Sequence, residues 1–120
     1  MTEETLRRRV RRILASLARE QTTVTYRDLA ALAEVPPPQS IHKLAETLEE
    51  TMREDHENGV PLIAALVVGR GSRGLPQRGF FELLRQLGRY DGPDEGPEAE
   101  EIFHEELMLA WDYWGSGRAS

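Results

Sequence analysis

Apolar residues recur every three or four positions in five segments of the chain, which is the spacing that buries one face of an α-helix. These segments cover residues 6–17, 26–32, 41–52, 80–87 and 103–114. Between the third and the fourth, residues 62–68 read LIAALVV, a wholly apolar run that predicts a short buried strand. The pattern predicts a mainly helical (α+β) fold with a sheet of at most two or three strands.

Residues 25–48, TYRDLAALAEVPPPQSIHKLAETL, predict two amphipathic helices joined by a turn. Thr25 is expected to cap the first helix, with Leu29 and Leu32 on its inner face. Three consecutive prolines cannot donate helical hydrogen bonds, so the chain is expected to turn before Ser40 caps the second helix. The stretch therefore predicts a helix-turn-helix, although an ordinary helical hairpin with a proline turn would show the same pattern.

The second helix of this pair has an inner and an outer face. Its inner stripe is expected to be Ile41, Leu44, Leu48 and Met52, and its outward positions are Gln39, His42, Lys43 and Glu46. In a DNA-binding helix-turn-helix, the start of this helix would enter a groove.

The other segments complete a single domain over residues 1–120. A first helix is expected to bury Leu6, Val10, Ile13, Leu14 and Leu17, with Arg7, Arg8, Arg11 and Arg12 in solvent. Gly59 should end the long helix, and Gly88 or Gly92 the next one. The glycine-rich turn 69–74 permits a returning strand over residues 75–78, which would form the wing of a winged helix. Residues 22–90 would then be helix-turn-helix and wing, 91–97 an acidic loop, and 98–114 a C-terminal helix whose inner stripe includes Trp111 and Trp114.

Charge is segregated along the chain, although the net charge is −6. Residues 1–45 and 69–90 are basic, with net charges of +3 and +4, whereas residues 46–68 and 91–120 are acidic, with −5 and −8. If the basic blocks share a face, they form an electrostatic footprint for a phosphate backbone. A soluble surface of mixed sign would give the same numbers.

Composition excludes several kinds of chemistry. The chain has no cysteine, which rules out disulfides, thiol catalysis and cysteine zinc sites. No export signal or membrane-spanning run is found, so we expect a cytoplasmic protein. No serine has a local catalytic motif. Glu100, Glu101 and His104 have the spacing of a carboxylate metal site, but a solvated acidic helix start explains them better, because no second Glu-x-x-His is present. We therefore expect no catalysis, metal or cofactor.

The TY pair, the proline turn, Pro61 and the apolar run after it resemble the C-terminal DNA-binding domain of O6-alkylguanine DNA alkyltransferases and alkyltransferase-like proteins, over residues 22–90. The resemblance implies that Tyr26 contacts a backbone phosphate and that His42 replaces the arginine that fills the gap of a flipped base. The Pro-Cys-His-Arg site has no counterpart, because only Leu, Ile and Ala fall there. Separately, GLPQRGFF and LGRYDGP resemble segments of short bacterial proteins, which implies no activity.

Two functions remain open. In the first, a non-catalytic winged helix binds DNA, in a regulatory or repair role. Its contacts would be Tyr26, Arg27, Gln39, His42 and Lys43, with Arg70 and Arg73 on the wing. The carboxylates from Glu46 onward would keep that binding weak. In the second, the domain serves protein interaction or dimerisation, and its acidic C-terminal helix and aromatic stripe pair with a second copy or a basic partner.

Overall fold

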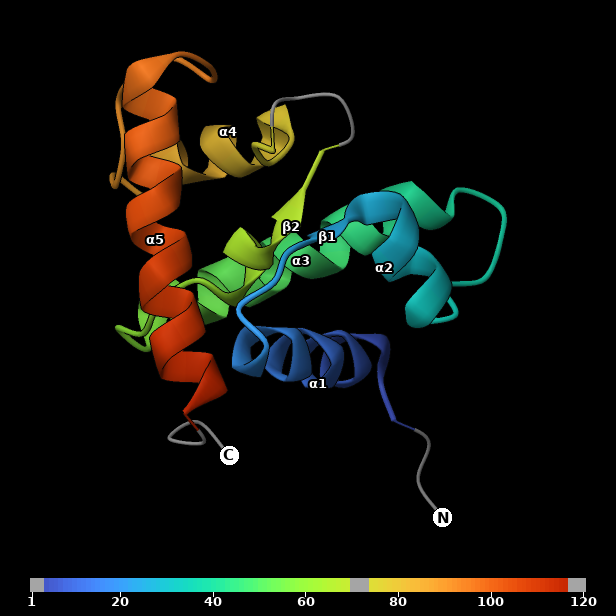
Figure 1. Cartoon of the computed structure of the whole chain (residues 1–120). Helices are drawn as coiled ribbons and strands as arrows, with labels where there is room; N and C mark the ends of the chain where they lie inside the picture. Colours follow the sequence, from blue (N-terminus) through green and yellow to red (C-terminus); the bar gives the residue numbers. More distant parts are fainter. Residues whose placement is uncertain (1–3, 70–73, 117–120) are drawn as a thin grey trace.

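The computed structural model describes residues 4–69 and 74–116 and is mainly helical over them (Figure 1). The elements, in chain order, are α1 (Leu6–Arg19), β1 (Val24–Thr25), α2 (Tyr26–Leu32), α3 (Ser40–Glu57), the 3₁₀ helix η1 (Ile63–Leu66), β2 (Val67–Val68), α4 (Arg78–Gln86) and α5 (Pro97–Gly115). The helical segments and the small sheet are confirmed. The expected helix over 98–114 is α5, one residue longer at each end.

The apolar run 62–68 lies at the centre of the molecule, where α1, α3 and α5 all contact η1. The prediction of a strand over the whole run was wrong, because only Val67 and Val68 are extended and residues 63–66 form a 3₁₀ turn. The physical reason is that two buried carboxylates, rather than a neighbouring strand, accept the hydrogen bonds of the backbone amides at the start of the run. Glu106 Oε2 accepts the Leu62 amide at 2.7 Å, and Asp55 Oδ2 accepts the Ile63 amide at 3.0 Å.

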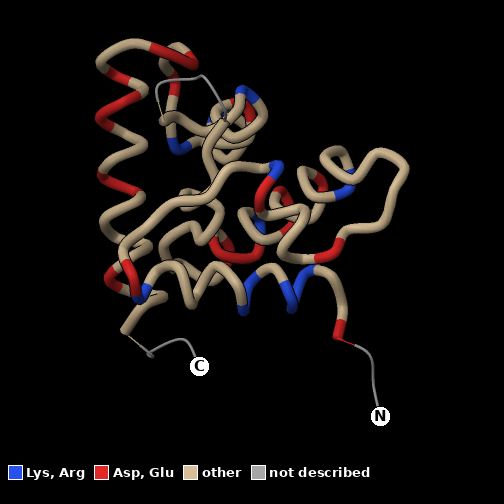
Figure 2. The backbone as a smooth tube through the Cα atoms, turned by 45° about the vertical axis from the view of Figure 1, so that its right-hand side comes forward, with Lys and Arg blue, Asp and Glu red and all other residues tan. Residues whose placement is uncertain are grey.

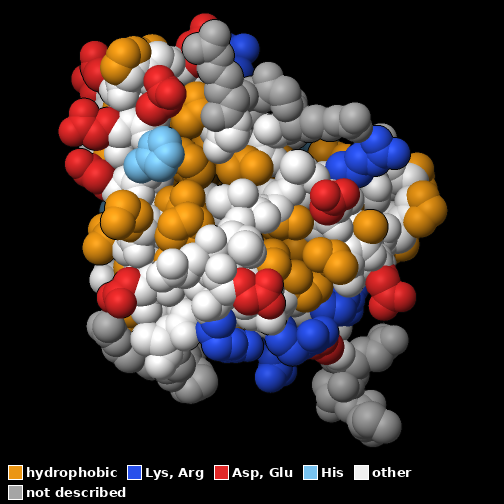
Figure 3. Space-filling view, viewed as in Figure 1, with side chains coloured by type: hydrophobic (Ala, Val, Ile, Leu, Met, Phe, Trp, Pro, Cys, Tyr) orange, Lys and Arg blue, Asp and Glu red, His pale blue; other side chains and the backbone are white. Residues whose placement is uncertain are grey.

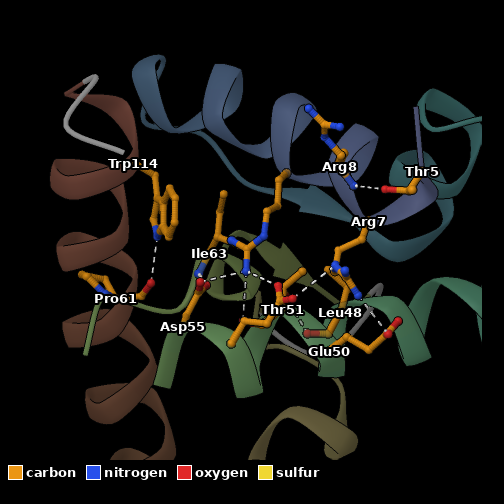
Figure 4. Close-up of polar contacts among 12 residues, drawn as sticks. Thr5, Arg7, Arg8, Leu48, Glu50, Thr51, Asp55, Pro61, Ile63 and Trp114 are labelled. Atoms are coloured by element: carbon orange, nitrogen blue, oxygen red, sulfur yellow. Dashed lines mark hydrogen bonds and ion pairs between the residues drawn. The ribbon is translucent and has the colours of Figure 1, made fainter. Parts of the chain in front are cut away.

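Each of these carboxylates also meets an arginine. Arg11 Nη2 lies 2.9 Å from Asp55 Oδ1 (Figure 4), and Arg89 Nη2 lies 3.0 Å from Glu106 Oε1. Burial raises the pKa of Asp55, while the Ile63 amide and Arg11 oppose that rise. The two acids come from α3 and α5, so together they fix the path of the chain between those helices.

The sheet has two strands among the described residues, and they run parallel, with Val24 opposite Val67 and Thr25 opposite Val68. The returning strand expected over 75–78 is not present. Gln77 instead precedes the first turn of α4, and the Gly69 amide donates to the carbonyl of Leu75 at 2.7 Å. The glycines at 74 and 79 and Pro76 favour this loop over a strand.

Two helix ends follow the sequence prediction. At the end of α3, Gly59 has φ +68°, and the Val60 amide bonds to the carbonyl of Asp55. At the end of α4, Gly88 has φ +75°, and the Arg89 amide bonds to the carbonyl of Leu84. Both are the left-handed glycine caps that satisfy otherwise orphaned carbonyls.

The sequence predicted that the arginines of α1 face solvent, but two of them pair with α3 instead. Arg7 reaches Glu50 and Glu54 on α3, at 3.2 and 3.3 Å, and Arg11 reaches Glu54 and Asp55 (Figure 4). The reason is that α1 has neighbours on more than one side, and α3 packs against the side that carries Arg7 and Arg11. Two of the six arginines of α1 are therefore paired with α3.

The aromatic stripe of α5 also belongs to the fold. Trp111 Nε1 donates to the carbonyl of Thr22 at 3.0 Å, and Trp114 Nε1 donates to the carbonyl of Pro61 at 2.7 Å. The guanidinium of Arg11 lies 5.3 Å from the centroid of the Trp114 ring. Both indole N–H groups are therefore bonded within the chain, and the pairing of the aromatic stripe with a partner stays a prediction.

Among the described residues, no helix has the length and apolar character needed to span a membrane.

Candidate nucleic-acid interface

Helix α2 begins as the sequence predicts. Thr25 is extended, and its Oγ1 accepts the Asp28 amide at 3.1 Å. Leu29 is fully buried, but Leu32 is 57% exposed, so the expectation that it lies on the inner face was wrong. Small side chains, Ala30 and Ala33, complete the inner face instead and leave Leu32 outside the contact with α3.

The turn between α2 and α3 carries three exposed prolines and two residues with positive φ, Glu34 at +53° and Gln39 at +60°. Val35 is its buried anchor. The prediction that Ser40 caps α3 was wrong, because Gln39 is the cap and its side chain makes no capping bond. Its left-handed backbone replaces the extended conformation of a serine cap, which makes Ser40 the first helical residue.

The first turn of α3 projects from the molecule. Along α3, Leu44, Leu48 and Met52 form the buried stripe as expected, but Ile41, in the first turn, is 37% exposed. Gln39, Ser40, Ile41 and His42 line an open hollow of about 530 Å³. The expected inner stripe therefore begins one turn later, because α2 is too short to cover Ile41.

The predicted basic contacts come from α2 and from this turn. Arg27 is exposed at the start of α2. Lys43 lies on the first turn of α3, and its Nζ donates to the carbonyl of Pro36 at 3.0 Å. His42 Nε2 is 3.1 Å from Glu46 Oε1. Residues 35–45 contain no carboxylate, so the start of α3 carries the positive charge and the acid begins at Glu46.

Tyr26 does not belong to this surface. It is only 8% exposed, and its hydroxyl accepts the Gln77 amide at 3.4 Å. Burial raises its pKa to about 12. The helical spacing of Tyr26 to Leu29 and Ala30 places all three on the buried face, which is a sequence signal that the resemblance to a phosphate-contacting tyrosine obscured.

Arg70 and Arg73, the predicted wing contacts, lie outside the described residues, so their contribution stays a prediction. The sequence placed Arg8 and Arg12 of the first helix in solvent, and the structure adds Arg19 to them as a basic surface on α1. All three are exposed along one side of that helix, whose basic positions are coloured in Figure 2, and basic side chains gather at the lower edge of the molecule in Figure 3. Only Arg12 of these three forms an ion pair among the described residues, with Glu4 at 2.9 Å.

The acidic helix start at 98–105 does not gather into a metal site among the described residues, where no three His, Cys, Asp or Glu side chains are grouped to hold an ion. The ring of His104 is turned back onto its own helix, with Nδ1 2.7 Å from the carbonyl of Glu100.

The chain matches no protein-family model, and searches of curated proteins and of solved structures return no match to it.

Proposed function

We propose that this protein is a non-catalytic DNA-binding protein of the winged helix-turn-helix type, which meets DNA with the first turn of α3. The observation that carries the proposal is the projecting, carboxylate-free start of α3, packed on α2 across the proline turn. The contacts are Arg27, Gln39, His42 and Lys43, and the wing contacts Arg70 and Arg73 stay predictions because they lie outside the described residues. Tyr26 is left out of the set because it is buried.

The helix end adds to the attraction. The first amides of a helix have no partner inside it and point outward, and the helix dipole favours an anion there. No side chain caps α3, so these amides and Lys43 can face a phosphate together. The side-chain amide of Gln39 is the group best suited to contact a base edge, because Gln and Asn side chains typically recognise adenine.

Acidic neighbours limit the affinity. Asp28, Glu34 and Glu46 are exposed around the same surface. A face that neutralises only a few phosphates gives micromolar or weaker binding at physiological salt, and the logarithm of the affinity falls with that of salt by about 0.9 per phosphate on duplex DNA.

The test is fluorescence anisotropy with a labelled duplex and a labelled single strand, at low and moderate salt. We expect Arg27→Glu/Lys43→Glu to lower the affinity at least tenfold. Arg53→Glu/Arg85→Glu makes the same charge change elsewhere on α3 and α4 and is the control for net charge. Arg53 lies ten residues beyond Lys43 on α3, about 15 Å away, farther than the Debye length of about 10 Å.

Two results would overturn the proposal. One is no binding to either probe at tens of micromolar protein. The other is an equal loss of affinity in both charge-reversed proteins, which would mean that net charge rather than the start of α3 attracts the DNA.

Protein interaction is the second candidate, and a separate observation favours it. Four large apolar side chains are exposed among the described residues, Leu32 and Ile41 at the proline turn and Met108 and Leu109 on α5. Exposed apolar side chains flanked by charge are common features of docking surfaces.

A further inference from the structure

The exposed side of α5 combines acid with two large apolar side chains. Met108 is 66% exposed and Leu109 is 56% exposed. Glu101 and Glu105 lie two turns and one turn before them, respectively, on the same side, and Asp112 lies one turn after. Residues 97–115 contain no lysine or arginine. The acidic stripe consists of Glu101, Glu105, Met108, Leu109 and Asp112, and Figure 2 shows acidic positions recurring along α5.

The exposed side of α1 has the opposite charge. Its basic stripe consists of Arg8, Arg12 and Arg19, with the small residues Ala15 and Ser16 between the second and the third arginine. Arg8 and Arg19 form no ion pair among the described residues, and neither do Glu101 and Glu105. Arg8 and Arg19 on one stripe, and Glu101 and Glu105 on the other, are therefore charges that no ion pair within the described part of the chain uses.

The two stripes have the same spacing. The arginines stand at positions 8, 12 and 19, and the carboxylates at 101, 105 and 112, so each set has offsets of 0, 4 and 11 residues. In this register Met108 and Leu109 stand opposite Ala15 and Ser16. Large apolar side chains thus meet small ones, which allows the two helices to approach closely.

We propose that α5 of one copy docks along α1 of a second copy, in parallel register, as the interface of a homo-oligomer. Arg8 and Arg12 pair with Glu101 and Glu105, and Arg19 faces Asp112. Met108 and Leu109 lie over Ala15 and Ser16 and supply the apolar part. The proposal makes specific the protein-interaction candidate and does not depend on DNA binding, because none of its residues belongs to the start of α3.

Charge selects this pairing over the symmetric ones. Two copies of α5 face to face would bring Glu101 and Glu105 against their own counterparts, and two copies of α1 would oppose arginine to arginine. Like charges in contact are unfavourable, whereas the mixed pairing is complementary along its whole length. Because the two surfaces differ, the contact is heterologous and extends head to tail or closes into a ring.

The size of the surface predicts a weak assembly. Eleven residues of helix span about 17 Å, so one helix pair falls below the roughly 1,200 Å² typical of stable interfaces. Arg12 exchanges its bond with Glu4 for one with Glu105, which costs little because exposed ion pairs contribute little to stability. We expect salt-sensitive association in the range of tens to hundreds of micromolar.

A charge swap tests the register. One variant is Arg8→Glu/Arg12→Glu, and the other is Glu101→Lys/Glu105→Lys. Each alone carries two like-charged stripes and is expected to be monomeric in sedimentation velocity at concentrations where the native chain associates. An equimolar mixture of the two restores opposite charges at every contact and is expected to regain the mass of the native assembly. Circular dichroism and thermal melting establish that each variant is folded.

The matched control for Glu101→Lys/Glu105→Lys is Glu46→Lys/Glu49→Lys. It makes the same change in net charge on α3 and should associate like the native chain. Three results would each overturn the proposal. They are a native chain that stays monomeric at several hundred micromolar, variants that associate as the native chain does, and monomeric variants whose mixture stays monomeric.

Discussion

Two regions of this protein use charged residues in opposite ways. In the central region, where the chain passes from α3 through η1 to β2, Asp55 and Glu106 are buried, and each bonds one backbone amide and one arginine. At the start of α2 and in the first turn of α3, Arg27 and His42 are exposed. A buried charge must be paired and bonded, so it fixes the local structure, whereas an exposed charge contributes little to folding and remains available to a partner.

The contrast predicts which substitutions change stability and which change binding. Substitutions in the central region should lower the free energy of unfolding and have no specific effect on DNA affinity. Substitutions at the start of α3 should lower DNA affinity and leave the free energy of unfolding nearly unchanged.

The largest effect is expected from Asp55→Ala. It leaves the Ile63 amide and the Arg11 guanidinium without their shared acceptor, and removing one partner of a buried ion pair typically costs about 3 to 5 kcal/mol. Urea denaturation measures the loss. Glu57→Ala, an exposed carboxylate on the same helix, is the control and should stay within about 0.5 kcal/mol of the native chain. Equal, small losses of stability from Asp55→Ala and Glu57→Ala would show that Asp55 does not hold the central segment in place.

The next effect divides α2 into its two faces. Leu29→Ala should lower the free energy of unfolding by about 2 to 5 kcal/mol, because it opens a cavity at a fully buried position. Leu32→Ala removes the same atoms from an exposed position and should change it by less than about 0.5 kcal/mol. Thermal melts of the pair provide the comparison. A destabilisation by Leu32→Ala as large as that by Leu29→Ala would mean that α2 is rotated relative to the structure.

The smallest effect separates Tyr26 from the proposed DNA surface. Tyr26→Phe removes a hydroxyl that accepts the Gln77 amide, so it should cost about 0.5 to 1.5 kcal/mol of stability. Its affinity for the labelled duplex should equal that of the native chain. If the affinity falls while the denaturation midpoint is unchanged, Tyr26 contacts DNA after all and the resemblance to the alkyltransferase domain gains direct support.

Local signals in the sequence predicted most of the helices. Leu44, Leu48 and Met52 form the expected stripe, Thr25 caps α2, and Gly59 and Gly88 end their helices, because periodicity, caps and left-handed glycines act within one or two turns of chain. The run 62–68 was misassigned because an apolar stretch without periodicity fits either a strand or a buried turn. The deciding bonds came from acids 8 and 44 residues away along the chain.

The candidate interface shows the same division. Arg27, Gln39, His42 and Lys43 can be assigned to an outward surface from helical spacing alone, whereas Tyr26 is withdrawn from it by a contact with Gln77, 51 residues later. The sequence by itself determined that the chain is mainly helical, where α3 and α4 end, and which face of α3 is buried. Only the tertiary structure decided which charges are fixed inside the fold, because burial and pairing depend on elements that lie far apart in the sequence and meet only when the chain has folded.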